Sequence, residues 1–171
     1  MTDLSNMTAL FDNLKKTAAA NSTTSKSTSG NNYVDGGDGD DSIFVKGNQN
    51  VVRGGNGDDT IFSTGDENTI LGDAGKDNIA SNGNKNVVSG GDGDDNIAVA
   101  GNENTVYGRA GKDNIAVVGD SNKVDGGDDD DQLAVIGNSN LVNGGAGNDK
   151  ILAQGDKNEV HGDDGDDEIY F

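Results

Sequence analysis

The 171-residue sequence contains no cysteine, no proline and no tryptophan. Without cysteine, disulfide bonds cannot brace the fold, and the redox state of its compartment cannot be inferred. Proline lacks the backbone N–H that a paired strand uses, so its absence is typical of a chain with strands throughout. No run of 18 apolar residues is present, and the sequence therefore predicts no transmembrane helix.

Apolar and basic residues are also scarce. Hydrophobic residues make up 30% of the chain and aromatic residues 4%, too little for the core of an ordinary compact domain. The 12 Lys and Arg face 31 Asp and Glu, which gives a formal net charge of -19. This charge argues against nucleic acid or an anionic membrane as partner and favours a cation. Taken alone, the composition would predict disorder.

An 18-residue repeat nevertheless organises the chain, and one copy contains Gly54-Gly55-Asn56-Gly57-Asp58-Asp59. Each of the eight copies opens on a glycine: Gly36, Gly54, Gly72, Gly90, Gly108, Gly126, Gly144 and Gly162. Each closes five residues later on an aspartate: Asp41, Asp59, Asp77, Asp95, Asp113, Asp131, Asp149 and Asp167. A branched aliphatic follows two residues after the aspartate, and another nine residues later. Such a period predicts an all-β solenoid whose turns bury their few apolar side chains against one another.

The first half of each repeat has the residues of a cation site. Glycines at loop positions one, two and four are expected to allow positive φ and close backbone approach, so that carbonyl groups turn inward. The aspartate at position six adds an anionic oxygen. Calcium prefers six to eight oxygen ligands of these kinds, which two stacked loops can supply and one loop cannot. We therefore predict calcium ions between consecutive turns.

The second half of each repeat reads Gly-x-x-Asn-x-Val and has no such loop. Its asparagines form a complete column: Asn32, Asn50, Asn68, Asn86, Asn104, Asn122, Asn140 and Asn158. A side-chain amide both donates and accepts hydrogen bonds, so stacked asparagines can form a ladder. We expect this structural ladder to close the second edge without an ion.

The Gly-Gly-x-Gly-x-Asp-x-(Ile/Leu)-x nonapeptide resembles the RTX, or hemolysin-type, calcium-binding repeat. The resemblance implies a right-handed parallel β-roll, calcium between adjacent loops, and type I secretion to the cell surface or the medium. It also implies ligands from the loop aspartate and from backbone carbonyls of loop positions one to four. The first site would then use Gly37, Gly39 and Asp41 with Gly54, Asn56 and Asp59.

Eight loops leave seven gaps, so we predict up to seven calcium ions. Besides the eight aspartates and the first-site residues, the implied site residues are Gly55, Gly57, Gly72, Asp73, Ala74, Gly75, Gly90, Gly91, Asp92, Gly93, Gly108, Arg109, Ala110, Gly111, Gly126, Gly127, Asp128, Asp129, Gly144, Gly145, Ala146, Gly147, Gly162 and Asp164. Lys76 and Lys112 occupy position five of the third and fifth loops. The sequence leaves open whether those two loops bind calcium.

Three segments are predicted along the chain. Residues 1–20 carry Leu4, Met7, Leu10, Phe11 and Leu14 at helical spacing, which predicts a short amphipathic helix. We expect it to cap the open apolar end of the first turn. A leader or a partner-docking helix is the alternative. Residues 21–30 are rich in Ser and Thr and read as a linker, and residues 31–171 form the roll.

Strand alternation predicts an apolar stripe on the outside of the roll: Phe44, Phe62, Ala80, Ala98, Ala116, Ala134, Leu152 and Tyr170. Such a stripe is either tolerated or is a homodimer or partner surface. The asparagine half-turn resembles grass ice-binding solenoids, so ice binding is an alternative function. The outward columns that would have to be regular are mixed, however, as in Ser42, Thr60 and Asn78. A surface-layer, matrix or adhesin-type structural module also remains open.

No enzymatic activity is predicted. His161 is the single histidine and occupies a variable column. The repeated carboxylates are equivalent, whereas general acid–base catalysis needs two carboxyl groups in different environments. The final residues, Glu168-Ile169-Tyr170-Phe171, resemble the end of type I secreted proteases. They also read as a last strand.

Overall fold

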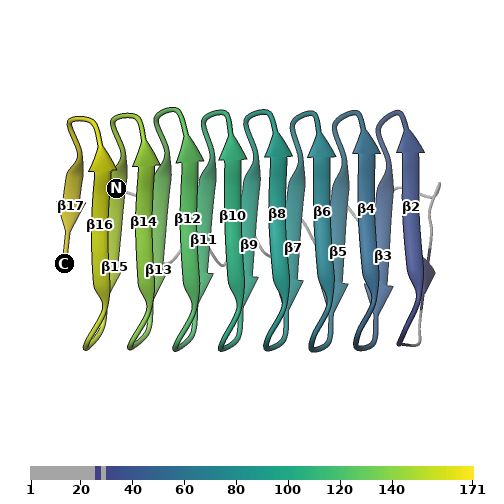
Figure 1. Ribbon diagram of the computed structural model, residues 1–171. Coiled ribbons are helices and arrows are strands. Elements are labelled where there is room, and N and C mark those ends of the chain that lie inside the picture. Colours follow the sequence, from purple (N-terminus) through teal and green to yellow (C-terminus); the bar gives the residue numbers. More distant parts are fainter. Residues whose placement is uncertain (1–25, 28–29) are drawn as a thin grey trace.

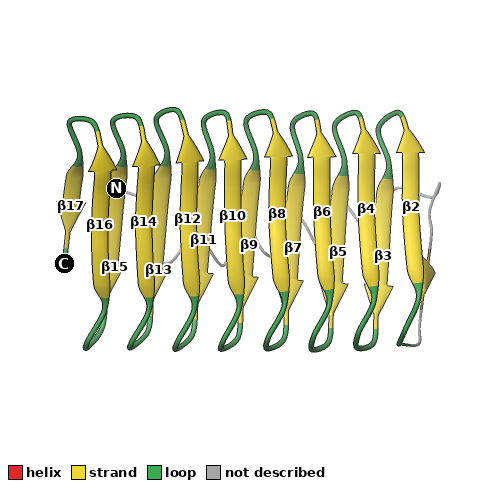
Figure 2. Cartoon of the chain, in the orientation of Figure 1, coloured by secondary structure: helices red, strands yellow, loops and turns green. Residues whose placement is uncertain are grey.

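The computed structural model describes residues 26–27 and 30–171, which form one solenoid of parallel strands (Figure 1). The described part consists of strands joined by turns, as the yellow and green segments of Figure 2 show. It contains no helix long and apolar enough to cross a membrane. The predicted all-β solenoid is therefore confirmed.

The strands fall into two sheets that face each other. Sheet A consists of β1 (Lys26–Ser27), β3 (Ser42–Lys46), β5 (Thr60–Thr64), β7 (Asn78–Asn82), β9 (Asn96–Ala100), β11 (Asn114–Val118), β13 (Gln132–Ile136), β15 (Lys150–Gln154) and β17 (Glu168–Tyr170). Sheet B consists of β2 (Tyr33–Asp38), β4 (Val51–Asn56), β6 (Thr69–Ala74), β8 (Val87–Asp92), β10 (Thr105–Ala110), β12 (Lys123–Asp128), β14 (Leu141–Ala146) and β16 (Glu159–Asp164).

From β2 onward, the register of both sheets follows the sequence repeat. Ile61 pairs with Ile79 and Ile79 with Ile97, so the offset between neighbouring strands is one 18-residue repeat. In Figure 1 the strands of sheet B run upward in front and those of sheet A run downward behind, while the chain advances from right to left. This is the sense of a right-handed coil. Each side-chain column of the sequence therefore becomes a straight row along the roll.

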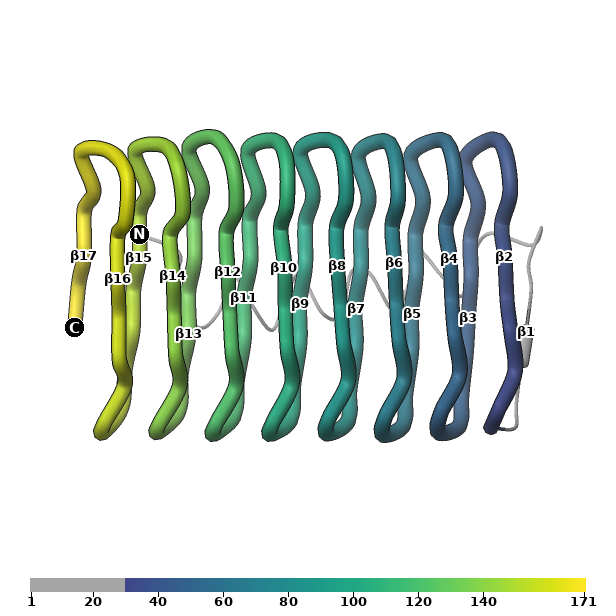
Figure 3. The backbone as a smooth tube through the Cα atoms, in the orientation of Figure 1, coloured from purple at the N-terminus to yellow at the C-terminus, as the bar shows by residue number. Residues whose placement is uncertain are grey.

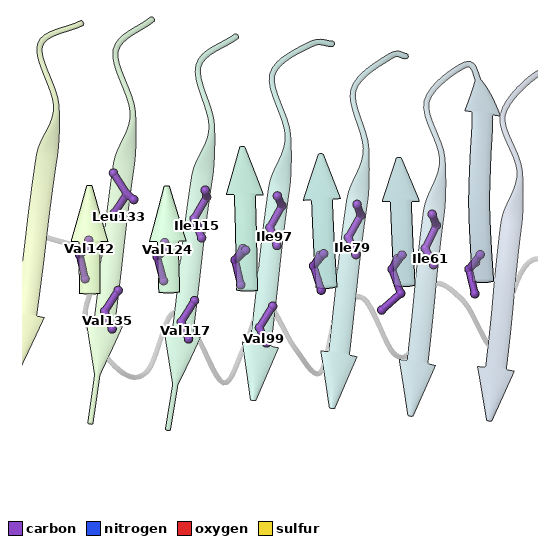
Figure 4. Close-up of a cluster of buried hydrophobic side chains, with 14 of the residues drawn as sticks. Ile61, Ile79, Ile97, Val99, Ile115, Val117, Val124, Leu133, Val135 and Val142 are labelled. Atoms are coloured by element: carbon purple, nitrogen blue, oxygen red, sulfur yellow. The ribbon is translucent and has the colours of Figure 1, made fainter. Parts of the chain in front are cut away.

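The core is a thin layer of aliphatic side chains between the sheets (Figure 4). Sheet A contributes the column of Ile61 and sheet B the column of Val52, and both columns are buried except in the last turn, where Val160 is partly buried and Ile169 is exposed. A third row contains Val45, Val99, Val117 and Val135, interrupted by the buried polar residues Ser63 and Ser81. Each fully buried Ile, Leu or Val stabilises the fold by roughly 1.5–3 kcal/mol. The predicted aliphatic columns are thus confirmed as the core.

The two ends of the chain differ in how they relate to the predictions. Residues 1–20, with the predicted capping helix, lie outside the described residues. Within the predicted linker, β1 pairs with β3, and Lys26 is in register with Phe44. At the other end, β17 pairs in parallel with β15, so Glu168–Tyr170 forms the last strand. A role of these residues in export stays a prediction.

The outer face of sheet A differs from the expectation of an exposed apolar stripe. Ala80, Ala98, Ala116 and Ala134 are only 0–4% exposed, and Phe62 is 5% exposed. Phe44 and Leu152 are half-buried, while Tyr170 at the end of the row is exposed. The alternation that points the stripe away from the core is correct, but the expected exposure is wrong in the middle of the row.

Candidate metal-binding edge

The roll has two chemically different edges. The Gly-rich loops connect sheet B to sheet A and form the upper edge in Figure 3, which we call the acidic edge. The Gly-x-x-Asn turns connect sheet A to sheet B and form the lower edge, which we call the asparagine edge. Because strand register is kept throughout, the same residue type recurs at the same place on each edge.

On the acidic edge the closing aspartates point into the roll. Asp59, Asp77, Asp95, Asp113, Asp131 and Asp149 are only 0–2% exposed. One carboxylate oxygen, Oδ1, accepts a hydrogen bond from the backbone N–H of the aspartate one turn earlier. The N–Oδ1 distance is 2.7 Å from Asp41 to Asp59 and 2.8 Å from Asp77 to Asp95. The column is therefore a continuous ladder inside the roll.

The second oxygen of each carboxylate, Oδ2, has no such partner. It is buried and without a hydrogen bond in Asp41, Asp59, Asp77, Asp95, Asp113, Asp131 and Asp149. Leaving a buried polar atom unsatisfied costs roughly 1–3 kcal/mol, and more when the group is charged. Among the described residues, these seven oxygens are buried acceptors that have no donor, and there is one for each gap between consecutive loops.

Burial and mutual repulsion change the acidity of this column. Desolvation, together with the charge of neighbouring carboxylates, raises the pKa of Asp77 and Asp95 to about 7, and that of Asp131 to about 8. The same two causes raise the pKa of Asp113 to about 6. In each case they outweigh the backbone hydrogen bond, which lowers the pKa. At neutral pH the metal-free column would therefore hold protons that the unfolded chain has lost.

These shifts predict that the metal-free roll is more stable in acid. The folded-state pKa lies above the unfolded value of about 3.9, so the folded state binds more protons. The resulting stabilisation is present below about pH 4 and is lost as pH rises through about 6 to 8. Each carboxyl group contributes roughly 1.4 kcal/mol per pH unit within its window. Far-UV circular dichroism in chelator should show more β-structure at about pH 5.5 than at about pH 8, and an unchanged or opposite response would contradict the prediction.

The position-one glycines are needed for space, which corrects the expectation that they provide positive φ. Positive φ occurs at positions two and four, as in Gly55 and Gly57, but not at Gly54. A Cβ on Gly54 would collide with Oδ2 of Asp59. The inward carboxylate therefore occupies the space that the absent side chain leaves on the opposite strand.

Positive φ at positions two and four is kept even where the sequence departs from glycine. Asp73, Arg109 and Asp163 at position two have φ of 79°, 97° and 71°, and Asp129 at position four has φ of 75°. A non-glycine residue in this region costs on the order of 1–2 kcal/mol. The irregular loops therefore keep the backbone conformation of the regular ones.

Several oxygens lie between the first two loops. A Cβ added to Gly36 would collide with the carbonyl oxygen of Gly54 in the next turn. A Cβ added to Gly55 or Gly57 would collide with the carbonyl group of Gly37 or Gly39, respectively, in the preceding turn. Oδ2 of Asp41 lies 2.7 Å from that same Cβ position on Gly36. Oδ1 of Asp59 and the carbonyl oxygen of Asn56 face the first loop, where they accept hydrogen bonds from the backbone N–H of Asp41 and Gly39. Each of the six residues implied for the first site thus has an oxygen close to the adjoining loop, and their role as calcium ligands stays a prediction.

The same arrangement recurs along the edge. The Oδ2 of a loop aspartate and the carbonyl oxygen of the next position-one glycine both crowd the Cβ position of Gly36, Gly54, Gly72, Gly108, Gly126 and Gly144. Among residues 26–27 and 30–171, no cluster of three or more His, Cys, Asp or Glu side chains could hold a metal by itself. A cation at this edge therefore needs backbone carbonyls. A set of carboxylate and carbonyl oxygens fits a hard cation such as calcium.

The charged residues of the irregular loops point away from the aspartate column. Lys76 and Lys112 are exposed, and Nζ of Lys112 lies 2.6 Å from Oδ2 of Asp130. Nε of Arg53 lies 2.7 Å from Oδ2 of Asp73 in an ion pair outside the roll. The guanidinium group of Arg109 lies 4.4 Å from the ring centre of Tyr107.

An outer ladder at loop position five was not anticipated from the sequence. Oδ1 of Asp58 accepts the backbone N–H of Lys76, and Oδ1 of Asp94 accepts that of Lys112, at 2.8 and 2.9 Å. The frequency of aspartate at this position was the available signal. These exposed carboxylates support the loop backbone one turn further on, including the two lysine loops.

The asparagine edge uses the same hydrogen bond without the charge. The backbone N–H of Asn68 donates to Oδ1 of Asn86, and that of Asn86 to Oδ1 of Asn104, both at 2.8 Å. Amide-to-amide bonds of the expected kind occur near the ends, for example from Nδ2 of Asn50 to Oδ1 of Asn68. In the middle, Nδ2 of Asn68, Asn86, Asn104 and Asn122 is buried without a partner. The principal donor of this ladder is therefore the backbone.

His161 lies outside both ladders. Its side chain is exposed, and Nε2 lies 3.0 Å from Oε1 of Glu159. This is a surface contact on sheet B, as expected for a variable column.

Comparison with known proteins agrees with the geometry of the acidic edge. The sequence profile of the RTX calcium-binding nonapeptide repeat matches residues 24–52, 46–79, 53–88, 81–115, 89–122 and 137–169. Together these matches span residues 24–122 and 137–169, which is well over half of the chain. No curated protein and no solved structure matched the chain. The repeat, the parallel roll and the matched profile together show that this chain belongs to the RTX family of calcium-binding nonapeptide repeat proteins.

Proposed function

We propose that the protein is a structural roll that binds calcium in the gaps of its acidic edge and folds when it does so. One observation carries this proposal: seven buried carboxylate oxygens have no hydrogen-bond partner, and each belongs to one gap. A cation beside these oxygens would satisfy them and offset the repulsion within the column. The asparagine edge has no anionic oxygen in its ladder and needs no ion.

In this proposal, one group of residues supplies the oxygens that bind calcium and another group keeps the strands in register. The inward aspartates supply charged oxygens, and the loop glycines bring carbonyl oxygens of consecutive turns close together. The core columns and the asparagine ladder hold the strands in register, so that each gap has the same shape. When bound, calcium supplies the positive charge that neutralises these carboxylates. The role we propose is structural rather than catalytic.

We place the protein outside the cell. Extracellular calcium modules work at roughly 10⁻⁴–10⁻³ M calcium, and a chain whose folding waits for such concentrations would stay unfolded before export. Type I secretion, which the family resemblance implies, agrees with this order of events. A role of Glu168–Phe171 in export is part of the proposal, in addition to the strand that Glu168–Tyr170 forms.

Ice binding has less support than calcium binding. It would need a flat, regular and exposed face. The middle outer row of sheet A is buried, and the corresponding row of sheet B mixes Arg53, Leu71, Ser89 and Tyr107. A matrix or surface-layer scaffold is compatible with a calcium-dependent roll and shares its test.

The number of bound ions tests the proposal. Isothermal titration calorimetry of the full chain is expected to give up to seven calcium ions per chain, and magnesium should not substitute because it requires tighter octahedral geometry. Asp95→Asn removes an anionic ligand that borders two gaps, so about two ions should be lost or bound at least tenfold more weakly, equivalent to about 1.4 kcal/mol each.

Asp120→Asn is the matched control, because it makes the same chemical change at an exposed position of the asparagine edge. It should leave the stoichiometry unchanged. Equal losses in both variants would show that calcium responds to net charge only and would contradict the assigned edge.

A further inference from the structure

We propose that the outer face of sheet B carries a carbohydrate-binding hollow between β10 and β12, next to the acidic edge. The two strands are neighbours in the sheet (Figure 1), and the hollow between them has a volume of about 330 Å³. This inference goes beyond the calcium sites, because Tyr107, Arg109 and Asp125 point away from the core whereas the aspartate column points into it.

The hollow exists because large side chains on one strand stand beside glycine on the next. Tyr107 and Arg109 of β10 are in register with Asp125 and Gly127 of β12. The backbone of Gly126 and Gly127 forms the floor, and a Cβ on Gly127 would collide with the carbonyl oxygen of Arg109. The volume lies at the lower end of the roughly 300–1,000 Å³ of small-molecule sites, so the hollow suits a ligand of about one sugar ring.

Arg109 has an unusual place in this hollow. Its φ is 97°, in a column where Gly91 provides the same conformation without strain. Strained residues of this kind cluster where a side chain has a function. The guanidinium group stacks on the ring of Tyr107, and within residues 26–27 and 30–171 it has no ion pair. The other arginine of the chain, Arg53, pairs with Asp73. Arg109 therefore presents its N–H groups in a fixed position without an acceptor.

The remaining side chains of the hollow restrict the chemistry of its ligand. The carboxylates of Asp125 and Asp128 line it together with Arg109, and in the described part of the chain neither has a hydrogen bond or an ion pair. An anion would be repelled by both carboxylates. A simple cation would leave the guanidinium group unpaired, and an apolar ligand would leave all three groups unpaired. A neutral ligand that both donates and accepts hydrogen bonds satisfies all of them.

A sugar ring has this combination of groups. Each of its hydroxyl groups donates one hydrogen bond and accepts others, so adjacent hydroxyl groups can bind the planar fork of Arg109 and the carboxylates at the same time. Its C–H face can pack on the half-buried side chain of Tyr107 and on the glycine floor. The stacking on Tyr107 already orders Arg109, which lowers the entropy cost of binding.

An NMR titration of the isotope-labelled full chain in millimolar calcium tests the proposal. The probes are methyl α-D-mannopyranoside and methyl β-D-glucopyranoside, added to about 50 mM, because a ligand of this size binds with a dissociation constant on the order of 1 mM. At least one of them is expected to shift the backbone amide signals of Gly126 and Gly127 with saturation. If neither does, or if exposed glycines along the whole roll shift equally and without saturation, the proposal is wrong.

Arg109→Gly tests the role of the guanidinium group. It introduces the residue that the same column has one turn earlier, at Gly91. After circular dichroism in calcium has shown a folded chain, this variant should bind the glycoside at least about tenfold more weakly. Asp163→Gly makes the same kind of change in the same column three turns later and should leave binding unchanged. Equal affinity of the natural chain and Arg109→Gly would overturn the proposal.

Asp125→Asn tests the opposite wall and keeps the proposal testable if Arg109→Gly does not fold. Asparagine occupies this column one turn later, at Asn143. Loss of the charged acceptor should weaken binding at least about threefold. Asp35→Asn removes the same charge from the same column in the first turn and is the matched control. Equal effects of the two variants would show that net charge, not the hollow, determines binding.

Glycine is the competing probe, because its carboxylate and ammonium groups match Arg109 and Asp125. If glycine shifts the signals of Gly126 and Gly127 with saturation and the glycosides do not, the hollow binds a zwitterion, and the assignment to carbohydrate is wrong.

Discussion

In excess chelator at about pH 8, the full chain is expected to lose most of its far-UV β-sheet signal, and millimolar calcium is expected to restore it. At this pH the carboxyl groups of Asp77, Asp95 and Asp113 are largely ionised, because their folded-state pKa values are about 7, 7 and 6, and Asp131, with a pKa of about 8, is ionised in about half of the molecules. Without a cation, eight inward aspartates would stand in one row at strand spacing.

The size of this repulsion decides the outcome. Two carboxylates about 4.8 Å apart repel by roughly 3–4 kcal/mol at an effective dielectric constant near 20. A domain of this size has a net stability of roughly 5–15 kcal/mol. A few uncompensated neighbouring pairs therefore cancel the whole stability of the roll. The core cannot compensate, because each turn contributes only two or three buried apolar side chains.

Binding of calcium reverses the balance. An ion at about one hundred times its dissociation constant stabilises the folded state by about 2.7 kcal/mol per site. Because consecutive gaps share an aspartate, occupation of one gap also removes repulsion from the next, and the transition should be cooperative. A titration followed by circular dichroism should be sigmoidal, with magnesium as the control. An unchanged spectrum in chelator at about pH 8 would contradict the prediction.

The sequence predicted the fold well because the fold is periodic. The columns of Ile61 and Val52 recur at a fixed spacing, and a parallel stack is the arrangement that buries both columns in every turn. The register of the loop aspartates follows from the same period. The composition alone does not predict a fold, but the 18-residue repeat predicts both the stacking of the strands and their register.

Features that depend on contacts across the roll were not predictable in this way. The need for glycine at Gly54 comes from the side chain of Asp59 at the end of the same loop, five residues later, and not from the local backbone. The low exposure of Ala98 likewise cannot be inferred from strand alternation, which gives the direction of a side chain but not its exposed fraction. Backbone donors to the asparagine column also required the stacked geometry.

Replacement of four central aspartates by asparagine is expected to give a roll that folds without calcium. The variant is Asp77→Asn, Asp95→Asn, Asp113→Asn and Asp131→Asn. Asparagine keeps Oδ1, which accepts the backbone N–H of the preceding turn, and removes the buried charge. The asparagine edge already shows that this ladder is compatible with buried, unpaired Nδ2 atoms at Asn86 and Asn104. The change would make the central acidic edge a second asparagine edge.

The predicted gain appears only when calcium is absent. In chelator at about pH 8, the variant should retain most of its β-sheet signal under conditions that unfold the natural chain, and its acid stabilisation should largely disappear. In calcium, its stoichiometry should fall from about seven to about two, because only the first and last gaps keep aspartate on both sides. The matched control, Asp38→Asn, Asp92→Asn, Asp128→Asn and Asp164→Asn, removes the same charge from exposed position-three side chains. If this control folds in chelator equally well, net charge rather than the buried column causes the calcium requirement. If neither folds, the four central carboxylates are not the obstacle, and the reason for the requirement lies elsewhere in the loops.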